Sequence, residues 1–142
     1  MLRLLPYAQP RGQTRLSTIR RFALSFGLLY LGVTVLGITP MIGGTLGPET
    51  SWVLGLAPVN LAHNVLHACL GLMGLLASSR EGTSRAYARL LGVLLVALGI
   101  AGLTTQSPVL GLPLGGVDFL LHILSGGVAL YYGFAPGEPA QG

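Results

Sequence analysis

Apolar residues fill four long stretches of the chain, and polar or turn-forming residues fill the segments between them. The stretches cover residues 22–39, 59–77, 86–105 and 114–134. A helix rises about 1.5 Å per residue, so about 18 residues span about 27 Å, close to the thickness of bilayer hydrocarbon. Pro58 and Pro113 immediately precede the second and fourth stretches, and the first turn of a helix accepts proline. The pattern predicts an all-α integral membrane protein, a four-helix bundle.

The composition agrees with this fold class. Of the 142 residues, 51% are hydrophobic and only 8% are charged, and the mean hydropathy is +0.71. A soluble domain of this length needs more polar surface than that. The four stretches also occupy most of the chain, which leaves no length for a separate soluble catalytic domain. We therefore expect a non-enzymatic membrane component.

All basic side chains are arginines, and they lie on one side of the predicted helices. They precede the first stretch or flank the junction of the second and third: Arg3, Arg11, Arg15, Arg20, Arg21, Arg80, Arg85 and Arg89. Residues 40–57 and 106–116 contain no basic side chain. The positive-inside rule then predicts cytoplasmic tails at 1–20 and 136–142 around a transmembrane domain at 21–135. Because the arginines adjoin apolar stretches, we expect lipid as the partner and no nucleic acid.

The chain also repeats itself. A shift of 55 residues relates the second and fourth stretches: Pro58 falls on Pro113, His63 on Asp118, His67 on His122 and Gly71 on Gly126. A shift of 65 residues relates the first and third: Gly27 falls on Gly92, Gly37 on Gly102 and Thr39 on Thr104. Each unit holds two helices, so both copies enter the membrane from the same side. We predict two tandem helical hairpins related as parallel repeats.

Ionisable side chains interrupt the second and fourth stretches. His63 and His67 are spaced i, i+4, as are Asp118 and His122, so each pair lies on one helix face. Ionisable residues inside a membrane helix mark a candidate site. Polar and small residues accompany them: Asn60, Asn64, Gly71, Gly74 and Gly126. Because small residues permit close helix contact in lipid, we expect the two faces to meet and to gather the polar groups in the outer half of the bundle.

The first two interpretations of this polar cluster are a structural hydrogen-bond network and a site for a single metal ion. The one we favour is a structural network without a cofactor, in which Asp118 accepts a hydrogen bond from a histidine of the opposite helix. Asn60 or Asn64 would satisfy the remaining groups. The other is a divalent metal site, because three imidazoles and one carboxylate form a complete ligand set for zinc or a similar ion.

Two further interpretations remain open. His67 and His122 are equivalent under the repeat, as the two axial ligands of a haem would be, and Gly71 and Gly126 would leave room for the flat ring. A chain of histidine and aspartate side chains can also conduct protons or a small solute. Association with other membrane subunits or with a second copy is compatible with each of these interpretations.

The second and fourth stretches also resemble a known family. The residues that carry the resemblance are Val59–His67 with Gly71, and Asp118–His122 with Gly126. Together they look like the paired motif of a bacterial family of small four-helix membrane proteins, the domain of unknown function 4383. The resemblance covers roughly residues 20–134 and implies a four-span fold in a bacterial cytoplasmic membrane, without an activity or a cofactor. Gly115 and Phe119 depart from the pattern, which has asparagine at both positions.

Overall fold

The computed structural model describes residues 16–105 and 108–136. Within these residues the elements are α1 (Thr18–Gly37), η1 (Pro40–Ile42), β1 (Ser51–Val53), β2 (Ala57–Val59), α2 (Leu61–Ala77), α3 (Glu81–Thr104) and α4 (Asp118–Phe134). The chain is thus mostly helical, with the four helices that the apolar stretches predict. Residues 1–15 and 137–142, which make up most of the two predicted tails, lie outside the described residues.

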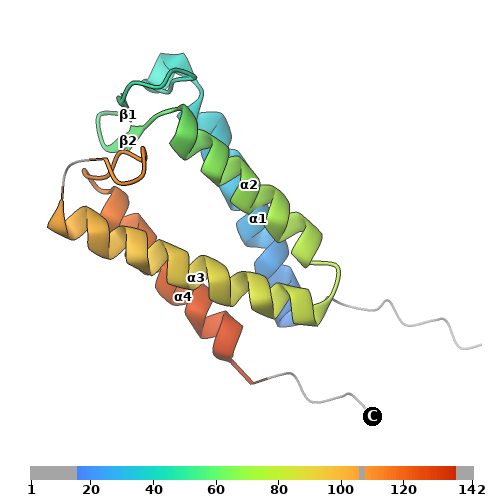
Figure 1. Cartoon of the computed structure of the whole chain (residues 1–142). Coiled ribbons are helices and arrows are strands. Elements are labelled where there is room, and N and C mark those ends of the chain that lie inside the picture. The colour runs from blue at the N-terminus through green and yellow to red at the C-terminus, as the bar shows by residue number, and fades with distance from the viewer. Residues whose placement is uncertain (1–15, 106–107, 137–142) are drawn as a thin grey trace, which may run out of the picture.

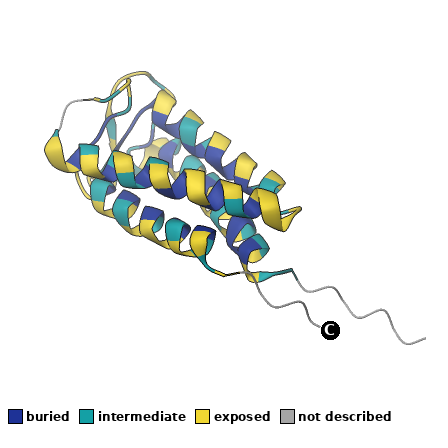
Figure 2. Ribbon diagram, turned by 60° about the horizontal axis from the view of Figure 1, so that its bottom comes forward, coloured by how far each residue is buried: buried dark blue, intermediate teal, exposed yellow. Residues whose placement is uncertain are grey.

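The helices pack as two pairs. α1 packs along α2 and α3 along α4, and the contacts between the pairs are less extensive. Figure 1 shows the antiparallel β-hairpin and the loop before α4 together, at the end where α2 and α4 begin. In Figure 2 the buried faces of the helices turn toward one another and the exposed faces turn outward. The fold therefore has one end that holds the β-hairpin and the starts of α2 and α4, and another that holds the short α2–α3 turn, the start of α1 and the end of α4.

The start of α2 is set by an asparagine cap. Asn60 Oδ1 accepts a hydrogen bond from the backbone N–H of His63 at 2.9 Å, which satisfies a donor that the first turn leaves free. Pro58 lies in β2 opposite Trp52, instead of in the first helical turn as predicted. The helix therefore begins at Leu61, two residues inside the predicted stretch.

Two glycines place the start of α4 later in the chain than predicted. Gly115 and Gly116 have φ angles of 138° and 57°, which an L side chain adopts only with strain. An added Cβ at Gly116 would also overlap the carbonyl oxygen of Leu56, so the loop can pass there only without a side chain. The helix therefore begins at Asp118 instead of Leu114.

Glycines bring the two helices of each pair close together. An added Cβ at Gly71 would lie 3.0 Å from the carbonyl oxygen of Gly27, and one at Gly126 would lie 3.0 Å from that of Gly92. At Gly74 it would lie 2.8 Å from the Cα of Gly27. We expected these glycines of α2 and α4 to bring those two helices together, but the contacts lie within each pair. Helices that follow each other in the chain are usually neighbours in space. Here the glycines lie between the two helices of such a pair.

Large apolar side chains cover much of the outer surface. Exposed examples on the four helices are Leu28, Val35, Leu72, Leu90, Val93 and Leu124. The core between the helices includes Ala23, Tyr87, Leu91, Leu95 and Ala129. By length and composition α1 and α3 are able to cross a membrane, and α2 is a shorter apolar helix.

Candidate functional site

Three histidine side chains meet between α2 and α4. His63 and His67 belong to α2 and His122 to α4, and one ring nitrogen of each lies within 4.8 Å of the others. The ring centroids are 4.5 Å apart for His63 and His67, 6.0 Å for His63 and His122, and 6.5 Å for His67 and His122. All three side chains are buried, with 3%, 6% and 4% exposed. The structure thus brings imidazoles from both helix pairs into one group, the histidine trio.

Asp118 joins this trio through His122. Its Oδ2 lies 3.5 Å from Nδ1 of His122, one turn further along the same helix. That separation is longer than an ordinary hydrogen bond. The predicted structural network gave Asp118 a histidine of the opposite helix as its partner, whereas the nearby histidine lies on its own helix.

The trio and Asp118 contain buried polar atoms that form no hydrogen bond with the described residues. Nδ1 of each histidine and Oδ2 of Asp118 are buried and have no hydrogen-bond partner among the described residues. Leaving a buried donor or acceptor unpaired costs about 1–3 kcal/mol. The arrangement is therefore not a saturated hydrogen-bond network, and it leaves nitrogen lone pairs for a ligand.

The side chains of Asn60 and Asn64 bind backbone carbonyls, and none of these bonds involves an imidazole of the histidine trio. Besides capping α2, Asn60 donates from Nδ2 to the Gly111 carbonyl at 2.9 Å. Asn64 donates from Nδ2 to the carbonyls of Gly37 at 2.9 Å and Thr45 at 2.8 Å. The six predicted residues therefore divide into a histidine–aspartate group and two loop-binding amides.

A cavity of about 190 Å³ adjoins the trio between α1 and α4. Its lining consists of Leu29, Tyr30, Val33, His67, Asp118, Leu121, His122 and Ser125. The ring of Tyr30 lies 5.3 Å from that of His67, and Tyr30 and Ser125 line the cavity from α1 and α4. Tyr30 was not predicted, because a tyrosine in an apolar stretch carries no signal of a polar site. The sequence features that point to this cavity are the predicted residues His67, Asp118 and His122.

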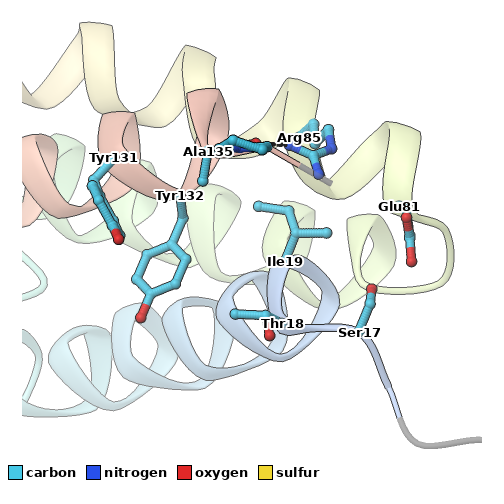
Figure 3. A pocket seen from close by; sticks show the side chains of 9 residues that line it. Ser17, Thr18, Ile19, Glu81, Arg85, Tyr131, Tyr132 and Ala135 are labelled. Carbon is cyan, nitrogen blue, oxygen red and sulfur yellow. Dashed lines mark hydrogen bonds between the residues drawn. The ribbon is translucent and has the colours of Figure 1, made fainter. Parts of the chain in front are cut away.

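The opposite end of the bundle has a different chemistry. A cavity of about 180 Å³ lies there, and Figure 3 shows Tyr132 reaching from α4 toward α1 beside it. The Tyr132 ring stacks on Phe22 at 5.0 Å. Arg85 donates to the carbonyl of Ala135 at 2.6 Å, as a basic residue does at a helix C-terminus. Arg85 binds backbone at this end, whereas the three histidines and Asp118 lie together at the other end.

Searches among curated proteins and among solved structures found no match. A family model described as a domain of unknown function (DUF4383) matches residues 20–135, which is most of the chain. The matched range runs from α1 to the end of α4 and contains every residue of the histidine–aspartate group. The chain therefore belongs to the DUF4383 family, which confirms the resemblance seen in its paired motif.

Proposed function

We propose that the protein crosses a bacterial cytoplasmic membrane four times and binds one divalent transition-metal ion through His63, His67 and His122. The proposed role is binding and not catalysis, and the lipid bilayer is the proposed partner. The observation that carries the metal proposal is the trio itself: three buried imidazoles with ligand atoms within 4.8 Å of one another.

The membrane part of the proposal is supported by surface and charge. Leucine and valine side chains of all four helices face outward, which suits hydrocarbon better than water. The described arginines lie near the α2–α3 turn and the start of α1, whereas the loops at the other end contain none. The positive-inside rule then gives cytoplasmic ends and an outer loop region. α2 and α4 have 17 residues each, near the lower limit for a span.

A cysteine-labelling experiment tests this topology. Cys69 is replaced by serine, and Glu49→Cys in the outer loop is compared with Ser79→Cys in the α2–α3 turn. In intact cells a membrane-impermeant maleimide is expected to label Glu49→Cys, while Ser79→Cys reacts only after permeabilisation. Equal labelling of both variants in intact cells would show that the proposed topology is wrong.

The metal part is supported by coordination geometry. Zinc binds imidazole nitrogen at about 2.0–2.1 Å, so the ligand atoms of a tetrahedral site lie about 3.4 Å apart. The ligand atoms of the trio lie within 4.8 Å of one another, so binding one ion requires the rings to approach by up to about 1.4 Å. Metal-binding histidines usually donate their other N–H to a backbone carbonyl or a carboxylate, which fixes the ring. The Asp118 carboxylate is such a neighbour for Nδ1 of His122, which leaves Nε2 of that ring for the ion.

The same geometry disfavours haem. His67 and His122 have their ring centroids 6.5 Å apart, but the ring of His63 lies 4.5 Å from one and 6.0 Å from the other. A macrocycle bound between two axial ligands needs that space free on all sides of the iron. We therefore propose a bare ion and not haem.

Elemental analysis tests the metal proposal. Protein purified in detergent and incubated with Zn²⁺ is expected to retain about one zinc per chain after dialysis, and His67→Ala is expected to retain almost none. Cys69→Ser is the matched control, because the exposed thiol lies outside the trio and its loss leaves the zinc content unchanged. No retained zinc, with no Soret absorption either, would leave the trio with a structural role and overturn the proposal.

A further inference from the structure

The cavity beside the trio opens sideways, toward the proposed lipid phase. Leu29 and Leu121 form its rim on α1 and α4 and are 51% and 54% exposed. Its floor is formed by His67, Asp118 and His122, each at least nine-tenths buried. A path between two helices thus leads from an apolar surface to the unpaired polar atoms.

The outer side of the trio is covered by loops. The β-hairpin and the segment before α4 lie over the helix starts (Figure 1). Two bonds join these loops to each other and to α2: Asn60 Nδ2 donates to the Gly111 carbonyl, and the Val117 N–H donates to the Leu56 carbonyl at 3.1 Å. The lateral cavity is therefore the more direct approach to the histidines.

A metal ion bound by three histidines has one coordination position left for another ligand. Zinc sites with three protein ligands bind water or another molecule in the fourth position. Three neutral imidazoles leave the full charge of +2 on a divalent ion, and Asp118 offsets one unit of it. An ion in a low-dielectric interior favours a further negative ligand, because an unbalanced buried charge is costly.

We propose that a membrane-dissolved amphiphile enters between α1 and α4, and that its anionic oxygen head binds the ion of the histidine trio. The class of ligand is a single carboxylate or similar oxyanion on a hydrocarbon tail. The tail lies along Leu29, Val33 and Leu121, and the head reaches the floor of the cavity. This inference rests on the proposed metal function and adds the ligand class and its route.

Protein loaded with Co²⁺ and embedded in lipid nanodiscs tests the inference, because the visible absorption of cobalt reports its fourth ligand. Decanoate and acetate have the same head and differ in the tail. Decanoate is expected to change the spectrum at a concentration at least about tenfold lower than acetate does, since each buried methylene adds to binding. A response that is equal for the two acids, or that follows only pH as bound water would, overturns the inference.

Two substitutions check the route. Leu121→Trp fills the rim of the cavity from α4, and Val33→Phe fills it from α1. Both are expected to keep the bound cobalt and to lose most of the decanoate response, whereas Leu124→Trp, on α4 outside the cavity, keeps both. An unchanged decanoate response in the filled variants overturns the lateral route while the metal function stands. Absence of bound cobalt in the unmodified protein overturns the metal function and this inference together.

Discussion

The α1–α2 hairpin and the α3–α4 hairpin share their packing and differ in their polar ends. In the half nearer the α2–α3 turn, Gly71 meets Gly27 in the first hairpin, and Gly126 meets Gly92 in the second. These four glycines are the ones that the two sequence shifts relate, so the contacts support the proposed repeat.

The halves nearer the β-hairpin differ at equivalent positions. In the first hairpin the side chain of Asn64 fills the space beside Gly37 and binds the carbonyls of Gly37, at the end of α1, and Thr45, in the loop. In the second, Phe119 lies beside Gly102 and makes an apolar contact instead. His63 likewise corresponds to Asp118. The comparison indicates a common scaffold in which one hairpin supplies two imidazoles, and the other supplies one imidazole and a carboxylate.

Removing a histidine from either hairpin should have the largest effect. His67→Ala and His122→Ala are each expected to lower Zn²⁺ affinity more than about 100-fold, because each removes a ligand and the loss of a mere supporting group already costs 10- to 100-fold. Competition with a fluorescent zinc chelator measures the affinity. If His122→Ala binds zinc as tightly as the unmodified protein, the site belongs to the α2 pair alone, and the second hairpin contributes no ligand.

Replacing the carboxylate should have an intermediate effect. Asp118→Asn keeps the shape but removes the charge beside His122, and zinc affinity is expected to fall about 10- to 100-fold. Glu49→Gln in the outer loop is the control and should leave the affinity unchanged. An equal loss in both variants would indicate a general electrostatic effect instead of a specific role for the Asp118 carboxylate.

The shared glycines should give matched losses of stability. Gly71→Ala and Gly126→Ala each introduce a methyl group against a backbone oxygen at 3.0 Å, and each is expected to cost about 2 kcal/mol of unfolding free energy. Gly127→Ala meets no atom within 4 Å and is expected to be neutral or slightly stabilising, since alanine favours helix. Reversible unfolding in mixed detergent micelles measures all three. A loss in only one hairpin would count against the proposed repeat.

The sequence predicted the helices and the grouping of the histidines because both depend on local spacing. An 18-residue apolar run and an i, i+4 pair are readable from the chain without knowledge of neighbours. The β-hairpin was not predicted: its strands have three residues each, and its turn uses positive φ angles at Leu54 and Gly55. The roles of Asn60 and Asn64 were also missed, because they depend on loop carbonyls distant in the chain, including Gly111 and Gly37.

The smallest expected effect concerns the position where the two hairpins diverge. Asn64→Leu removes both hydrogen bonds to Gly37 and Thr45 and is expected to cost about 1–2 kcal/mol, because the Thr45 carbonyl loses its donor and the Gly37 carbonyl keeps only the backbone N–H of Thr45. Phe119→Leu only trims an apolar contact at the equivalent position and is expected to cost less than about 1 kcal/mol. Thermal unfolding in detergent compares the two variants. Equal losses would mean that Asn64 acts through its volume, as Phe119 does, and that the polar character of the first hairpin contributes no stability beyond packing.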